Sequence, residues 1–199
     1  MRRSHEIPPL MRLSTEHGFP LWIAWATAVG GWSLTRMGKP TEGLAQINQG
    51  LAIIQMIGAE IEVQHGLSLQ AEVYGQAGQV EVGLKIINNA LRRLELNENE
   101  DRSAEAELYR VKGELLLMLE SPDAESSFQQ AITIATMQNA KMWQLRATVS
   151  LCRLWQSQGK GTEAYEKLSV IYNWFTEGFD TLDLQKAAAL LDQLIEGQS

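Results

Sequence analysis

Apolar residues recur along this chain at spacings of three and four, which places them on one face of successive helices. The clearest example is the stretch 41–56, TEGLAQINQGLAIIQM, whose large apolar residues are Leu44, Ile47, Leu51 and Ile54. Small residues, Gly43 and Gly50, alternate with them. The same order of large and small positions returns in 83–94, 124–135 and 164–175. A pattern that returns at a nearly fixed interval predicts a repeat architecture.

Turn residues divide the chain into helices of similar length. Glycines that follow apolar stretches are typical helix ends, because glycine adopts the left-handed conformation found there. The predicted helices span 20–37, 41–56, 61–77, 80–96, 103–119, 122–138, 141–158, 162–174 and 182–195. We expect Ser121 to cap the helix that begins at Pro122, and Asp180 with Asp183 to form the capping pair of the last helix. Residues 11–17 could be the last turns of a further helix.

These helices predict an all-α fold of antiparallel helix hairpins. The expected divisions are an N-terminal tail or truncated helix (1–19), four repeats (20–58, 60–97, 103–138 and 141–178) and a C-terminal capping helix (179–199). The expected core residues are Leu44, Ile47, Leu51, Ile87, Leu91, Phe128, Leu168 and Tyr172. The aromatic segment 174–181 is expected to hold the last helix against the array, since repeat arrays need a cap. A contact with another domain or a partner is the alternative.

Charge and cysteine content narrow the function. The net charge of −7 argues against binding to a phosphate backbone, so we expect no nucleic-acid partner. No apolar run approaches the roughly 18–20 residues of a membrane span, and we expect no membrane association. Cys152 is the only cysteine, so the chain cannot form an internal disulfide, which is compatible with the cytoplasm. We therefore expect a cytoplasmic protein.

The helix pairs resemble tetratricopeptide (TPR) repeats, which place small residues, large residues and a turn glycine at set positions. One small position on the first helix of each pair is occupied by Gly31, Ala71, Gly113 and Cys152, which lie 40, 42 and 39 residues apart. The usual TPR interval is about 34 residues, so these helices are expected to be longer than usual. Glu120 stands where the third pair would carry its turn glycine. The resemblance implies a TPR-like α-α superhelix.

A narrower resemblance covers most of the chain from His17 onward. It rests on the segments HGFPLW (17–22), GGWSL (30–34), AEAELYRVKGELLL (104–117), FQQAITIA (128–135), RATVSLCRLWQSQGK (146–160) and WFTEGFDTLDLQKAAALL (174–191). These segments are similar to the C-terminal TPR region of large bacterial signalling proteins that also carry a cyclase-like or transcription-regulator domain and a P-loop ATPase domain. The catalytic domains have no counterpart in this sequence. The resemblance implies a sensory or regulatory interaction role.

TPR arrays bind partners along a concave face lined by the first helix of each repeat. The corresponding side chains form the expected partner-binding set: Trp25, Trp32, Arg36, His65, Glu72, Gln76, Glu107, Arg110, Glu114, Arg146, Arg153 and Gln156. Ala28, Thr35, Ser68 and Val149 occupy lining positions as well. Trp and Arg are enriched among the residues that dominate binding energy at interfaces. The alternative for Trp25 and Trp32 is packing against a preceding repeat.

Residues with catalytic potential are few. His5, His17 and His65 lack metal-ligand spacing, and we expect His65 at the surface and Cys152 in a packing position. The segment Gly159–Thr162 lacks the upstream glycine and the strand of a phosphate-binding loop and is better explained as a turn. Glu105 and Glu107, in a predicted first helical turn, are expected to be solvated or to interact with the helix dipole. No catalytic residue, metal or cofactor is therefore expected.

The favoured hypothesis is a non-enzymatic protein-interaction module with a protein or peptide partner, acting as a regulatory part of a bacterial signalling or transcription-control protein. The alternative is a sensor that binds a small effector in the groove of the superhelix, which a closed apolar pocket around Trp25 and Trp32 would favour. Self-association through the open N-terminal end is a third expectation, because an uncapped repeat exposes apolar surface.

Overall fold

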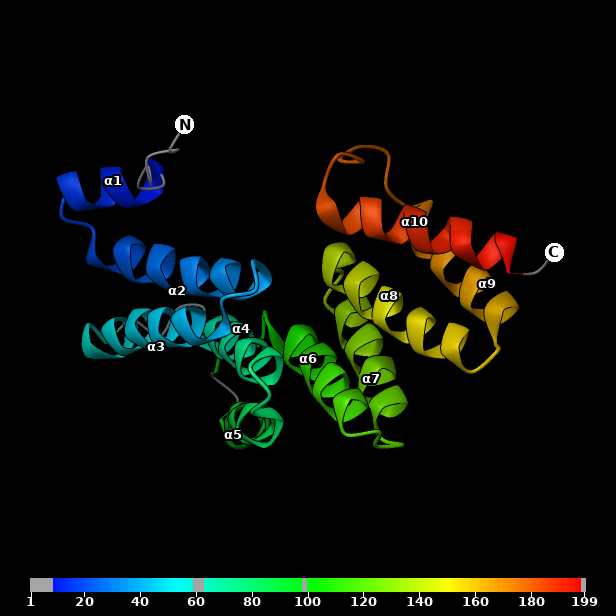
Figure 1. Ribbon diagram of the computed structural model, residues 1–199, viewed down its shortest axis with the longest axis horizontal. Helices are drawn as coiled ribbons and strands as arrows, with labels where there is room; N and C mark the ends of the chain where they lie inside the picture. Colours follow the sequence, from blue (N-terminus) through cyan, green and yellow to red (C-terminus); the bar gives the residue numbers. More distant parts are fainter. Residues whose placement is uncertain (1–8, 59–62, 98–99, 198–199) are drawn as a thin grey trace. The chain divides into compact units, whose positions relative to one another are not determined.

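The computed structural model describes residues 9–58, 63–97 and 100–197. Within these residues the regular structure is helical, and no strand is present (Figure 1). The helices are α1 (Pro9–Glu16), α2 (Pro20–Arg36), α3 (Pro40–Met56), α4 (Val63–Gln76), α5 (Val80–Leu96), α6 (Glu105–Met118), α7 (Ala124–Met137), α8 (Lys141–Ser157), α9 (Gly161–Tyr172) and α10 (Leu182–Glu196). The predicted all-α class is confirmed, and the predicted helix at 61–77 begins partly outside the described residues.

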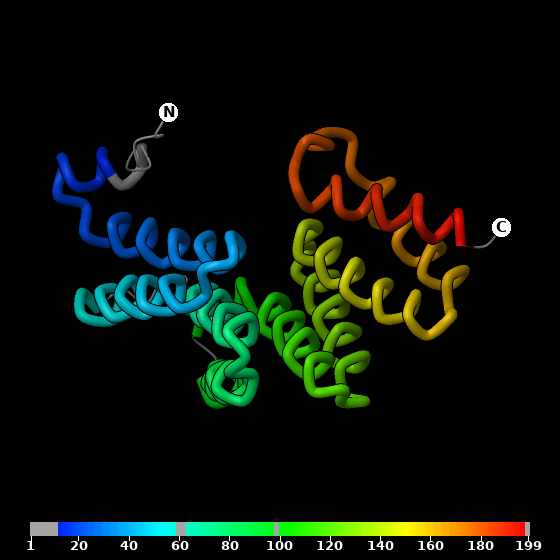
Figure 2. Tube along the Cα trace, in the orientation of Figure 1, coloured from blue at the N-terminus to red at the C-terminus, as the bar shows by residue number. Residues whose placement is uncertain are grey.

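The chain forms two compact units, residues 1–101 and 102–199. In the first unit α2 packs on α3 and α4 on α5, while α1 and α4 both contact α2. In the second unit α6 packs on α7 and α8 on α9, and α10 lies against both α8 and α9. Figure 2 shows the short connections that join the two helices of each hairpin. The division into four repeats with the stated boundaries stays a prediction.

Glycines set the distance between α2 and α3. A Cβ atom at Gly31 would lie 2.6 Å from the backbone oxygen of Gly43 and 2.6 Å from the backbone nitrogen of Ile47. A Cβ atom at Gly50 would lie 2.6 Å from the backbone of Ala24 and of Ala28. The two helices therefore touch backbone to backbone, which only residues without a side chain allow. This contact is the physical reason for the small positions in the sequence pattern.

The predicted core register is confirmed. Ile47, Ile87, Phe128 and Leu168 are fully buried, and Leu51 and Leu91 are nearly so. The remaining two expected core residues, Leu44 and Tyr172, are half-buried at the edges of their clusters.

In the second unit α10 closes the core through Leu184, Ala187, Leu190, Leu191 and Leu194. Phe175 packs against the same cluster, whereas Trp174 and Phe179 expose about half of their surface. Of the three aromatic residues expected to hold the last helix, Phe175 makes this core contact.

The helix ends correct the two capping predictions. The regular part of α7 begins at Ala124, with Asp123 at its N-cap, rather than at Pro122. Ser121 still makes the side-chain contact expected of it, because its hydroxyl accepts a hydrogen bond from the backbone N–H of Asp123 at 3.3 Å. Its own backbone N–H donates to the carbonyl of Leu116 at the end of α6. The N-cap of α10 is Thr181 rather than an aspartate pair, and no side-chain hydrogen bond caps that helix.

Candidate interaction faces

Glu72 is the centre of a polar cluster between α2 and α4 in the first unit. Its carboxylate accepts a hydrogen bond from Trp32 Nε1 at 3.2 Å and from Gln76 Nε2 at 3.2 Å. Arg36 Nη2 donates to the same carboxylate at 3.0 Å. The Arg36 guanidinium also lies over the Trp32 ring, 5.0 Å from its centroid. Four residues of the expected binding set therefore form one contiguous cluster.

Burial differs across this cluster. The Glu72 side chain retains 12% of its exposure, whereas the Arg36 side chain retains 43%. A carboxylate that is largely removed from water and bonded to three donors is held in one orientation. Glu72 thus fixes Trp32 and Arg36 in place, and the Arg36 guanidinium faces solvent with more N–H groups than this ion pair uses.

Trp25 and His65 also meet between α2 and α4. Their ring centroids are 5.9 Å apart, and Trp25 retains only 8% exposure within the core that includes Leu51. Trp25 therefore packs within its own unit, and its side chain is not available for contact with a partner. His65 is half-buried rather than fully at the surface.

A second cluster of expected binding residues joins α6 and α8 in the second unit. Arg110 makes a bidentate pair with Glu107, with Nε and Nη2 each 2.8 Å from a carboxylate oxygen. Arg146 Nη2 reaches the same carboxylate at 2.9 Å. Glu114 accepts from Arg110 Nη1 at 3.3 Å and from the Ser150 hydroxyl at 2.6 Å. These contacts tie the two helices together.

Glu107 and Arg110 are buried, with 1% and 7% exposure. Of the two expectations for Glu107, solvation is wrong, whereas its place in the first turn of α6 agrees with interaction with the helix dipole. Its position in the first turn of a helix suggested exposure, but α8 covers it and supplies Arg146 as a second cation. Removing one member of such a buried pair leaves an uncompensated charge and typically costs about 3–5 kcal/mol. This cluster orients α6 and α8. Only the side chains at its edge that keep some exposure can contact a partner directly.

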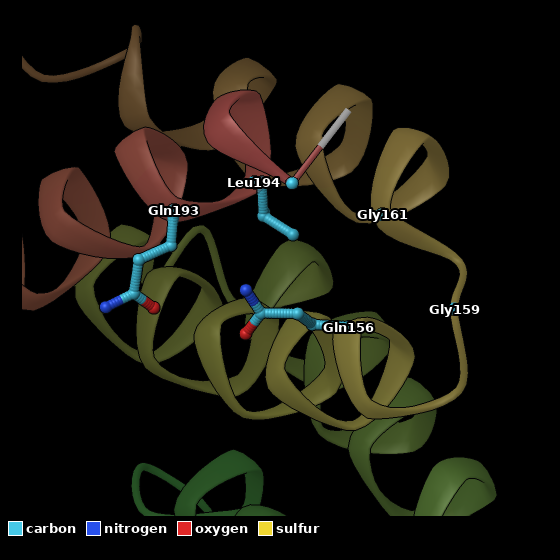
Figure 3. A pocket seen from close by; sticks show the side chains of 6 residues that line it. Gln156, Gly159, Gly161, Gln193 and Leu194 are labelled. Atoms are coloured by element: carbon cyan, nitrogen blue, oxygen red, sulfur yellow. The ribbon is translucent and has the colours of Figure 1, made fainter. Parts of the chain in front are cut away.

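Arg153 and Gln156 are the exposed members of the expected set on α8. Gln156 also lines a small depression of about 180 Å³, together with Gly159, Gly161, Gln193, Leu194 and Gly197 (Figure 3). The walls come from the end of α8, the start of α9 and the end of α10. The sequence analysis missed this depression because it joins residues about 40 positions apart through the packing of the last helix.

Among the described residues, nucleophilic and metal-binding groups give no further site. Burial raises the pKa of the Cys152 thiol to about 12, and its Sγ donates to the carbonyl of Ala164 at 3.2 Å. The thiol is therefore a neutral packing group, as its position in the repeat predicted. Within the described residues no cluster of three or more His, Cys, Asp or Glu side chains could hold a metal ion. In the same part of the chain no helix is long and apolar enough to cross a bilayer.

The chain resembles solved helical-repeat structures at low sequence identity. One is the set of nearly identical TPR-like repeats of a kinesin light chain from Podosopora anserina, with a TM-score of 0.61 and 14% identity over 90% of this chain and 88% of that one. A single-substitution variant of the same protein gives a TM-score of 0.62 at 13% identity, over 90% and 87%. No family model and no curated protein matches the chain. The fold is thus that of TPR-like helical repeats.

Proposed function

We propose that this protein is a non-enzymatic scaffold that binds a protein or peptide partner through the exposed residues of α2, α4 and α8. The observation that carries the proposal is the arrangement of Trp32 and Arg36 around Glu72. Side chains that are already fixed lose less conformational entropy on binding. Trp and Arg are also the side chains that most often dominate interface energies.

The chemistry of this cluster indicates what the partner supplies. Arg36 offers N–H donors beside the face of an indole ring, so it suits a partner segment with carboxylate or carbonyl acceptors. In the second unit Arg153 offers a second exposed guanidinium. Binding through two exposed cations should weaken as salt concentration rises.

The cellular role is a finer proposal. We place the protein in the bacterial cytoplasm, as a regulatory part of a signalling or transcription-control system. Support comes from the similarity of segments such as 174–191 to the TPR regions of such proteins, and from a sequence with one buried cysteine.

The test is a pull-down from lysate of the native host with the tagged full chain as bait. The matched variant Arg36→Ala/Arg153→Ala removes two exposed cations from the proposed faces. The control variant Lys85→Ala/Arg92→Ala removes two exposed cations from α5. All three baits are first compared by circular dichroism to establish that they are equally folded.

A protein retained by the wild type and the control but lost from the Arg36→Ala/Arg153→Ala bait would support the proposal. Titration calorimetry with that protein should then show at least tenfold weaker binding for the double variant, since two interface arginines are removed. Equal retention by all three baits would refute the role of these faces. If no protein is retained, native mass spectrometry should look for a bound small molecule, as the sensor hypothesis requires.

A further inference from the structure

A row of exposed and half-buried residues on α2 has the spacing of a helix–helix seam. Phe19, at the N-cap of α2, is followed along one side of the helix by Trp22, Ala26, Val29 and Ser33. Successive members are three, four, three and four residues apart, which is the pattern that one helix presents to another in a coiled coil. Phe19, Trp22 and Val29 retain 53%, 52% and 43% of their exposure, whereas Ala26 and Ser33 between and beyond them are half-buried, so α1 and α4 leave the large side chains of this row uncovered. We call these five residues the α2 ridge.

The α2 ridge carries no charge. From Pro20 to Thr35 the helix contains no Asp, Glu, Lys or Arg, although its other sides already pack on α3 and α4. A helix that is apolar on all sides is normally buried. Depletion of charge at the centre also distinguishes interfaces from ordinary surface. We infer that the α2 ridge is the interface of a homodimer, in which α2 packs antiparallel against α2 of a second copy.

The order of side-chain sizes along the ridge makes it complementary to itself. If the twofold axis passes near Ala26, Trp22 of one copy lies opposite Val29 of the other, and Phe19 lies opposite Ser33. Large side chains then meet smaller ones, and the smallest residue lies at the axis, where two helices approach most closely. A parallel arrangement would instead place Trp22 against Trp22. An isologous contact requires this kind of self-complementarity.

The exposed area sets the expected strength. The three large ridge side chains expose roughly 300 Å² per copy, since a fully buried aromatic side chain removes about 150–250 Å². With flanking residues such a contact falls in the small class of interfaces, below about 1,200 Å² in total. Interfaces of this size are typically weak and transient, and even larger ones extend to micromolar affinity, so we expect a reversible dimer with a Kd on the order of 10 µM. This inference is independent of the proposed function.

The test uses sedimentation equilibrium and disulfide trapping with the full chain. The wild type should shift from monomer to dimer between about 1 and 100 µM, as a Kd on the order of 10 µM requires. Trp22→Glu and Val29→Glu should each weaken the dimer at least tenfold. Val170→Glu replaces another exposed apolar residue, on α9, and should leave the dimer unchanged. Circular dichroism excludes unfolded variants from the comparison.

Cysteine trapping tests the antiparallel arrangement. In a Cys152→Ala background, Ala26→Cys should form a disulfide dimer under mild oxidation, because the two positions meet at the axis. Trp22→Cys should not form a disulfide dimer. The two copies of that residue would be about 12 Å apart in the direction of the helices, beyond the reach of a disulfide. A monomer at all concentrations, a dimer that tolerates Val29→Glu, or faster trapping at position 22 than at position 26 would each overturn the inference.

Discussion

Replacement of glycine by alanine should affect stability in opposite directions at two positions, because only one of them lies in the contact between α2 and α3. Gly31→Ala adds a single methyl group where its Cβ would lie 2.6 Å from two backbone atoms of α3. Gly161→Ala adds the same group at the start of α9, where no atom lies within 4 Å. The backbone conformation is compatible with alanine at both positions, so the comparison isolates the helix–helix contact.

The expected magnitude follows from two opposing terms. Replacing glycine by alanine inside a helix favours folding by about 1 kcal/mol. Carbon atoms in contact normally lie 3.5–4.0 Å apart, so the helices must separate by about 1 Å to admit the methyl group. Overpacking of this kind typically costs about 1–3 kcal/mol, and it is severe here because both contacted atoms belong to backbone. We expect Gly31→Ala to lower the stability of the first unit by about 2 kcal/mol in total.

Thermal unfolding followed by circular dichroism measures both effects. Gly31→Ala should lower the Tm of the first unit by about 8–16 °C, since 1 kcal/mol corresponds to about 4–8 °C in a unit of about 100 residues. Gly161→Ala should leave it unchanged or slightly raised. A Gly31→Ala variant that melts at or above the wild-type temperature would refute the backbone contact, because helix propensity alone would then account for the result.

Three further comparisons test separate features. Glu120 lies at φ 54° after α6, a conformation that glycine adopts without strain. Glu120→Gly should therefore raise the free energy of unfolding, measured with urea, by about 1 kcal/mol. No increase would contradict the left-handed helix end. Leu51→Ala should cost about 2–5 kcal/mol, whereas the exposed Gln49→Ala should change stability by less than about 0.5 kcal/mol, and equal unfolding of the two would refute the core register. Burial raises the pKa of Cys152 to about 12 in the folded chain, against an ordinary 9.0 in the unfolded chain. The contribution of the neutral thiol to stability is therefore complete well below pH 9 and is lost as the pH rises from 9 toward 12. Between pH 9 and 10 the wild type should therefore lose about 1 kcal/mol relative to Cys152→Ala, and parallel pH profiles would refute the buried thiol.

Most helix boundaries could be predicted because local chemistry determines them. Gly38, Gly58, Gly78 and Gly159 end their helices with φ between 66° and 80°, as the turn glycines indicated. Asn139 and Glu120 end helices in the same conformation at φ 52° and 54°. Asparagine adopts this conformation more readily than most residues and suits a helix end, whereas glutamate has no such preference, so the sequence carries no local signal at Glu120.

The candidate site could be predicted in part only. TPR positions identified residues that do cluster, since Trp32, Arg36, Glu72 and Gln76 share one network. The positions do not reveal which side chains are buried. Burial of Glu107 depends on how closely α8 approaches α6, and that distance follows from the packing of several side chains rather than from spacing within either helix.

The contacts within each unit have a consequence for how the chain acquires its structure during synthesis. Every helix pair in contact within the described residues consists of sequence neighbours, such as α2 and α3, or of next neighbours, such as α6 and α8. Chains with such short-range contacts fold in microseconds to milliseconds, whereas ribosomes add only about 5–20 residues per second. Each hairpin can therefore form soon after it leaves the ribosome exit tunnel, without waiting for distant segments. The first unit should be folded while the second is still being translated, which limits the time that the buried apolar side of α2 is exposed to other nascent chains.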